Sequence, residues 1–323
     1  MPEKIKMRTR MLPSMTNYEV EEYLQRNDII FVPIGVQEMH GGMPLDIEYV
    51  GAEAYSRVIA EEVDGLVLPN LVYCTAGGTV IGRGTVYMSM LNSIEYVRNI
   101  CHSLLNQGFR RIVLVPAHGD SKIIINALTS VFFDDTKCPM LYLDPGAIMR
   151  YKGVAVPWGG GPGGTGTPKL TTDENGIGCA TIDLGYYHIC GRINDVPTGA
   201  EVNDKPGSLS DSWLGHPDPW PFAPVDGFEE LSDLLKAYQN NYMPIPIYFR
   251  DWSDHGSQPL PLTREDVNRE GEIGEKMIRE AVEKVDWNRY MEGLRKADRC
   301  FQETIIPKYK DMLPKNRFYP NVY

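Results

Sequence analysis

Two apolar runs in this chain, residues 29–34 and 111–116, are each followed at once by histidine and acidic residues. The candidates after the first run are Glu38, His40, Asp46 and Glu48, and those after the second are His118 and Asp120. One such cluster is more often a solvated loop than a set of ligands. Two clusters of carboxylates and imidazoles, however, suit a pair of divalent metal ions better than any other group. The spacing therefore predicts a metal-dependent hydrolase.

The elements that would position these residues alternate between short apolar strands and amphipathic helices. The first helix has Thr16 as its expected N-cap and Glu19 at the capping-box position. Ser93 is the expected cap of a helix that ends near Gly108. Further helices are expected at residues 49–63, 121–133 and 264–284. Continuous apolar strands between such helices indicate a parallel sheet covered on both faces. Ligands of such sheets bind at the carboxyl ends of the strands, where both clusters fall.

The composition argues against several classes of protein. The 323 residues are 42% hydrophobic and 23% charged, as in ordinary globular proteins. A net charge of −11 argues against a protein that binds nucleic acid. No apolar run approaches the ~20 residues that a membrane-spanning helix needs, so no membrane contact is expected. The six cysteines are scattered without a Cys-x-x-Cys pair, which is typical of a reducing cytoplasm.

The first cluster resembles the signature of the creatininase (creatinine amidohydrolase) family. The matching pattern is an apolar strand, Pro and Gly, then Glu-x-His-Gly and Pro-Leu before an acid, within residues 32–48. Weaker matches follow in the family's order at residues 82–85, 111–120, 255–257 and 272–274. The similarity extends over roughly residues 12–285. The chain is identified as a divergent member, and the resemblance implies an α/β fold of three αβα layers with a mostly parallel central sheet.

The resemblance implies two divalent metal ions per chain, with zinc, manganese and iron as the candidates. The ligands that the family's motif assigns are Glu38 and His118 for one ion, His40 and Asp120 for the other, and Glu48 as the bridge. Asp46 is a rival for the bridge, because this chain is one residue shorter here than the usual motif. Glu48 is preferred because it keeps the family's register of Pro-Leu-x-x-acid.

The chain departs from the family where the catalytic acid–base residues are expected. The family's His-Ala-Gly-x-x-Glu-Thr-Ser motif corresponds here to Glu-Asn-Gly-Ile-Gly-Cys-Ala-Thr, so that Glu174 stands for the His and Cys179 for the acid. Either Glu174 is a carboxylate acid–base residue, or the reaction has changed or ceased. Among the other histidines, His255 is the first choice for the missing imidazole. Thr85, Trp158 and Cys179 are the expected substrate contacts.

The whole chain, residues 1–323, is expected to form a single creatininase-like domain with three irregular additions. A Gly-rich loop at residues 153–168 is either a flexible connector or a lid that carries Trp158 over the substrate. A Pro- and Trp-rich insertion spans about residues 191–262. A partly helical C-terminal extension, residues 286–323, is a candidate for docking on a neighbouring subunit.

The expected reaction is hydrolytic opening of a small cyclic amide at its C–N bond by a metal-activated hydroxide. The alternative is C–C cleavage of an oxidised cyclitol, an inosose-type diketone, which some relatives carry out. A third hypothesis, from another class, is a non-catalytic protein that binds a metal or ligand. Family members are commonly cytoplasmic homo-oligomers, often hexamers, so the resemblance also implies assembly and a cytoplasmic location.

Overall fold

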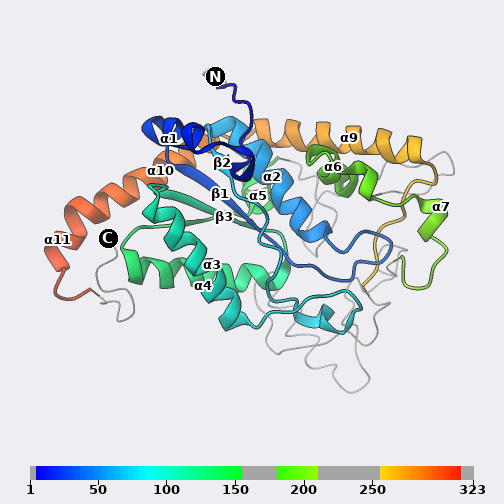
Figure 1. Ribbon diagram of the computed structural model, residues 1–323, viewed down its shortest axis with the longest axis horizontal. Helices are drawn as coiled ribbons and strands as arrows, with labels where there is room; N and C mark the ends of the chain where they lie inside the picture. Colours follow the sequence, from blue (N-terminus) through cyan, green and yellow to red (C-terminus); the bar gives the residue numbers. More distant parts are fainter. Residues whose placement is uncertain (1–4, 155–179, 210–254, 314–323) are drawn as a thin grey trace.

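The computed structural model of the chain describes residues 5–154, 180–209 and 255–313, apart from the side chain of Asp120. At its centre, the described part of the chain forms a sheet of four parallel strands in the order β2-β1-β3-β4 (Figure 1). The strands are β1 (Ile29–Ile34), β2 (Leu66–Val67), β3 (Arg111–Pro116) and β4 (Leu141–Tyr142). β1 and β3 pair over their full length with both ends level. The segments that follow these two strands therefore leave the sheet side by side.

Helices cover both faces of the sheet. The longer ones are α1 (Asn17–Arg26), α2 (Ile47–Val63), α3 (Met90–Asn106), α4 (Gly119–Thr136), α6 (Thr181–Ile189), α9 (Arg264–Glu283) and α10 (Trp287–Cys300). Phe31 of β1 lies in a core shared with α2, α6, α9 and α10, whereas Val32 lies in a second core with α1, α3 and α4. Because successive side chains of a strand point to opposite faces, β1 has to be apolar throughout. The predicted three-layer αβα fold is confirmed.

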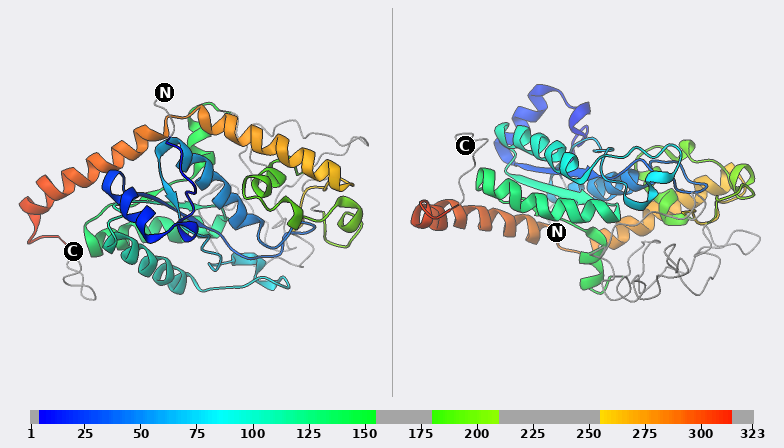
Figure 2. Two further views of the ribbon diagram at one scale, coloured as in Figure 1. Left: turned by 45° about the horizontal axis from the view of Figure 1, so that its top comes forward. Right: turned by 90° about the horizontal axis from the view of Figure 1, so that it is seen from below.

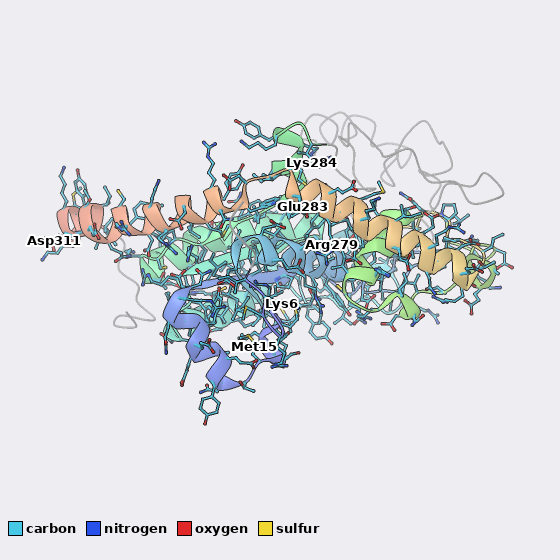
Figure 3. The ribbon with its side chains drawn as sticks, turned by 90° about the horizontal axis from the view of Figure 1, so that it is seen from above. Lys6, Met15, Arg279, Glu283, Lys284 and Asp311 are labelled. Carbon is cyan, nitrogen blue, oxygen red and sulfur yellow. The ribbon has the colours of Figure 1, made fainter. Side chains whose placement is uncertain are left out.

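Shorter elements connect these layers. They are η1 (Leu12–Ser14), η2 (Gly77–Ile81), α5 (Pro145–Tyr151), η3 (Ile193–Asp195), α7 (Gly199–Val202), the π-helical turn η6 (Phe301–Ile305) and α11 (Ile306–Tyr309). In Figure 3, α9 with Arg279 and Glu283 is followed by α10, and the chain passes Lys284 between them. Figure 2 shows that α10 and α11 reach beyond the sheet. None of the described helices is long and apolar enough to cross a membrane.

Of the two predicted helix N-caps, Thr16 and Ser93, the structure has only the first. The Thr16 hydroxyl accepts a hydrogen bond from the Glu19 N–H, and the Glu19 carboxylate accepts one from the Thr16 N–H, which confirms the predicted capping box. The prediction that Ser93 caps a helix is wrong. Ser89 caps α3 instead, because its extended backbone lets its hydroxyl accept the Asn92 N–H. Ser93 lies one turn inside the helix and is buried.

Candidate metal centre

The two predicted clusters do meet at the carboxyl edge of the sheet. Glu38 and His40 follow β1 in an irregular loop, and His118 follows β3 as the residue before α4. The Ala117 N–H donates to the Ile34 carbonyl at 3.1 Å, which keeps the two strand ends together beyond the last ladder pair. The level ends of two parallel strands thus place residues from distant parts of the sequence around one point.

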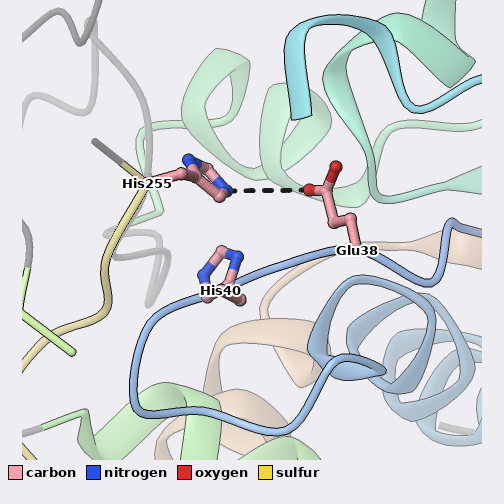
Figure 4. A group of neighbouring side chains, drawn as sticks. All are labelled: Glu38, His40 and His255. Atoms are coloured by element: carbon pink, nitrogen blue, oxygen red, sulfur yellow. Dashed lines mark ion pairs between the residues drawn. The ribbon is translucent and has the colours of Figure 1, made fainter. Parts of the chain in front are cut away.

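Glu38 is the residue on which the other side chains converge. Its side chain is 1% exposed. One carboxylate oxygen lies 3.2 Å from His118 Nε2 and also accepts a hydrogen bond from the Thr79 hydroxyl of η2. The other oxygen lies 3.7 Å from Nε2 of His255, which comes from the C-terminal part of the chain (Figure 4). A buried carboxylate is thereby surrounded by two imidazoles and a hydroxyl.

His40 completes a group with the donor atoms that a metal ion needs. The rings of His40 and His255 meet edge to face with their centroids 4.7 Å apart. One ligand atom each from Glu38, His40 and His255 lies within 4.8 Å of the other two. Two atoms bound to one tetrahedral zinc ion at 2.0–2.1 Å are roughly 3.3 Å apart, and the separation of 3.7 Å between Glu38 and His255 Nε2 is near that value. Among the described residues, the buried Nδ1 of His40 has no hydrogen-bond partner. The donor set therefore fits a divalent transition metal.

The electrostatics of the site also suit a metal ion. Burial would raise the pKa of the Glu38 carboxyl, but the imidazoles of His118 and His255 outweigh burial and hold that pKa well below its ordinary value. Burial, together with the neighbouring His255, lowers the pKa of His40 to about 3. Burial and the charge of Glu38 raise the pKa of Glu48 to about 7. Because metal ligands must be deprotonated, His40 is ready to bind at neutral pH, whereas Glu48 has to release a proton.

The loop that carries His40 is fixed to the segment that carries His255. Gly41 has φ +60°, and a Cβ atom there would lie 2.3 Å from the Ser208 carbonyl oxygen, so this close approach requires glycine. The Gly42 N–H donates to the Ser208 carbonyl at 3.0 Å and to the Ser257 hydroxyl at 3.2 Å. Ser257 pairs with Leu209 in a parallel bridge. This packing brings the C-terminal segment over the metal-binding loop.

Thr85 supports the loop from the other side. Its hydroxyl oxygen accepts the backbone N–H of Met39, the residue between Glu38 and His40, at 3.0 Å. The same turn also holds Gln37, whose side chain donates to the Gly84 carbonyl at 3.0 Å. Thr85 was predicted to contact substrate, and that role stays a prediction. In the structure, its hydroxyl fixes the backbone between two candidate ligands.

Asp46 and Glu48, the two candidates for the bridging carboxylate, have different surroundings. The Asp46 carboxylate is 2.6 Å from Nη2 of Arg192 and accepts a hydrogen bond from the Tyr187 hydroxyl. Glu48 lies in the first turn of α2, and the charges of Glu38, His118 and His255 shift the pKa of its carboxyl. Because the Asp46 carboxylate is engaged elsewhere, these contacts favour Glu48 as the bridge.

Sequence comparison relates part of the chain to a known family. Residues 13–152 match the creatininase family, described as creatinine amidohydrolase. The matched part contains β1, β3 and both clusters of candidate ligands. Somewhat less than half of the chain thus matches the creatininase family, which supports a divergent member. The match and the group of possible metal ligands support a metal-dependent enzyme of the amidohydrolase class. No curated protein matches the chain.

Solved creatininase structures share the fold. A creatinine amidohydrolase (creatininase) is 18% identical, with 85% of this chain and 97% of that chain covered and a TM-score of 0.53. A manganese creatininase is 20% identical, with 85% and 98% covered and a TM-score of 0.51. A mutant creatininase of Zn–Zn type is 19% identical, with 86% and 98% covered and a TM-score of 0.52. At these identities the likeness establishes the fold alone.

Several predicted creatininase site residues lie outside the described part of the chain. These are Glu174, Trp158 and Cys179, together with most of the Gly-rich loop. Asp120 is the second residue of α4, next to the cluster, but only its backbone is described. Of the other histidines, His188 lies 2.5 Å from Glu275 between α6 and α9, and His102 lies 3.1 Å from Asp135 between α3 and α4. Neither contacts the candidate metal centre.

Sequence reasoning missed three residues that contact candidate site residues. Thr79 donates to Glu38 from η2, and Tyr187 and Arg192 hold Asp46. No local pattern marks them, because each is an ordinary residue in a turn or helix. Thr79 follows two glycines, and this short polar turn is the sequence feature that comes closest to marking it as a site residue.

Proposed function

We propose that this protein is a metal-dependent hydrolase that opens a small cyclic amide at its C–N bond. The proposal rests chiefly on one observation: Glu38, His40 and His255 offer ligand atoms within 4.8 Å of one another, and His118 lies 3.2 Å from Glu38. Two divalent ions would be held by Glu38, His40, Glu48, His118 and Asp120. When bound, such ions polarise a substrate carbonyl and lower the pKa of water towards neutrality. Zinc and manganese are the first candidates, because similar creatininases are described with these metals.

The chain's own residues would prepare the site in distinct ways. Glu38 supplies a carboxylate that is ionised across the physiological range, and His40 supplies a neutral imidazole. Glu48, with a pKa of about 7, can hold or release a proton near working pH. His255 stands close enough to Glu38 and His40 either to bind a metal ion or to act as the acid–base residue for the leaving group. Glu174 is the second candidate for that proton transfer.

The location and assembly of the protein are part of the proposal. The described cysteines are all free, namely Cys74, Cys101, Cys138, Cys190 and Cys300, which supports a reducing compartment such as the cytoplasm. We also propose that the chain forms a homo-oligomer and acts on a small molecule. Light scattering of the purified protein would show the mass of the assembly, and a monomer would contradict this part of the proposal.

Elemental analysis tests the metal centre directly. The wild-type protein should contain about two transition-metal ions per chain, and Glu38→Ala and His118→Ala should each lower that content. His188→Ala is the matched control, because His188 also pairs with a glutamate but lies between α6 and α9. Its metal content should stay at the wild-type value. A wild-type protein that holds no metal after incubation with zinc or manganese would contradict the proposal.

Product analysis identifies the bond that is broken. A panel of lactams, formamides and cyclic diketones should give a new amine or ammonia if the enzyme cleaves a C–N bond. A carboxylate without an amine would instead indicate the C–C hydrolysis of an oxidised cyclitol. Bound metal without turnover of any compound would favour the non-catalytic alternative. His255→Ala adds a further distinction, because lost metal marks a ligand, whereas lost turnover with full metal content marks an acid–base residue.

A further inference from the structure

Asp46 occupies an unusual position. It is the residue before α2, where an aspartate commonly accepts hydrogen bonds from the first N–H groups of the helix. Its side chain makes no such capping bond. Instead, the buried carboxylate contacts Arg192 at 2.6 Å and accepts a hydrogen bond from Tyr187. The carboxylate thus joins the start of α2 to a distant part of the chain rather than capping its own helix.

Tyr187 and Arg192 form a rigid unit that receives Asp46. Tyr187 is a fully buried residue of α6, and the Arg192 N–H donates to its carbonyl at 2.7 Å. The Arg192 guanidinium lies 5.8 Å from the centre of the Tyr187 ring and also contacts Asp195 at 2.7 Å. An arginine that is held at several points in this way can orient a carboxylate with little freedom to move.

The consequence concerns the metal centre, because Glu48 follows Asp46 by two residues in the first turn of α2. We propose that Arg192 and Tyr187 are positioning residues of the metal centre: by holding Asp46 they fix the first turn of α2, and with it Glu48. This inference rests on the proposed function, in which Glu48 is a metal ligand. Without its partners, the Asp46 carboxylate would turn to cap its own helix, and the first turn would shift.

Metal affinity measured on the purified full-length protein tests the proposal. We use Zn²⁺ and Mn²⁺ in competition with a chelating dye, for the wild type, Arg192→Ala and Arg279→Ala. Arg279 is the matched control because it also ties α2 to the rest of the chain, through Glu61 at 2.8 Å, near the opposite end of that helix. Arg192→Ala should weaken at least one ion by roughly 10–100-fold, the usual effect of removing support behind a metal ligand. Arg279→Ala should stay within about twofold.

Two milder variants and a spectrum separate positioning from general damage. Arg192→Lys keeps the charge beside Asp46 and should recover most of the affinity, and Tyr187→Phe, which loses only the hydroxyl, should give a smaller loss than Arg192→Ala. The visible spectrum of Co²⁺ in the site should change in Arg192→Ala and not in Arg279→Ala. Wild-type affinity in Arg192→Ala, or an equal loss in both alanine variants, would overturn the positioning role while the proposed function stands. A wild-type protein that binds neither metal would overturn both, and metal binding without hydrolysis would contradict the proposed function alone.

Discussion

At the residue scale, the centre combines groups whose pKa values are moved in opposite directions by the same burial. His40 is held neutral, so the stability linked to it is present above its ordinary pKa of about 6.5 and is lost as the pH falls towards 3. Glu48 is held protonated up to a pKa of about 7. The folded, metal-free protein therefore binds more protons at Glu48 than the unfolded chain does between about pH 4.5 and 7. In that pH range, the contribution of Glu48 to the unfolding free energy decreases as the pH rises.

This predicts a pH dependence that one variant should remove. Between pH 5 and pH 8, the unfolding free energy of the metal-free wild type should fall relative to that of Glu48→Gln, because only the wild type has to ionise the buried carboxyl at position 48. Urea unfolding of both proteins in the presence of a chelator measures the difference. Saturating zinc should reverse the trend in the wild type, since the metal replaces the proton. Parallel pH profiles for the two metal-free proteins would contradict the pKa of about 7 for Glu48.

At the element scale, the crossing of α6 and α9 holds the C-terminal part of the chain against α2. Gly185 and Gly274 meet there, and a Cβ atom at Gly185 would lie 2.5 Å from the Gly274 carbonyl carbon. Thr181, four residues before Gly185, donates to the buried Glu270 of α9 at 2.9 Å. α6 also carries Tyr187, so the spacing of this helix pair influences how Asp46 is held.

Filling the crossing should therefore destabilise the protein. Gly185→Ala pushes two backbones apart and should cost about 1–3 kcal/mol, as overpacked cores do. Gly293→Ala is the control, because Gly293 lies on the exposed side of α10 with no atom near the added methyl group. That change should stabilise the protein by about 0.5–1 kcal/mol through helix propensity. Thermal or urea unfolding compares the two, and similar effects of both substitutions would show that the crossing has room to adjust.

At the scale of the whole molecule, the N-terminal and C-terminal parts share one core. Trp287 and Met291 of α10 pack in the same cluster as Phe31 of β1, and Trp287 is 1% exposed. The Trp287 indole N–H also donates to the Val282 carbonyl at 2.8 Å. The beginning of the predicted C-terminal extension is thus part of the hydrophobic core. The organisation of the whole chain as a single domain and the docking of the extension on another subunit both stay predictions.

The contribution of that helix can be measured. Trp287→Ala should lower the unfolding free energy by about 3–5 kcal/mol, the usual cost of removing a large buried aromatic side chain. Met312→Ala serves as the control near the end of the described chain, because Met312 is 82% exposed and should change stability by less than about 0.5 kcal/mol. Urea denaturation of both variants gives the comparison. A small effect of Trp287→Ala would mean that α10 only rests on the surface.

The sequence by itself determined the elements whose signals are local. Apolar runs predicted β1 and β3, and the capping box of Thr16 and Glu19 predicted the start of α1. The placement of Glu38 and His118 near each other also followed from sequence, because the ends of neighbouring parallel strands meet at one edge of a sheet. The sequence pattern predicted Ser93 as the N-cap of α3, whereas Ser89 caps this helix in the structure.

Only the tertiary structure decided which distant residues join the centre. His255 reaches Glu38 because Gly41 lets the metal-binding loop pack against Ser208 and the C-terminal segment. The contact between Arg192 and the Asp46 carboxylate likewise depends on packing between distant parts of the chain. Such contacts depend on how loops fold back over the sheet, and that path leaves no periodic pattern in the sequence. Local residue patterns carry information about helices and strands, whereas the composition of a site built across the chain is set by packing between elements.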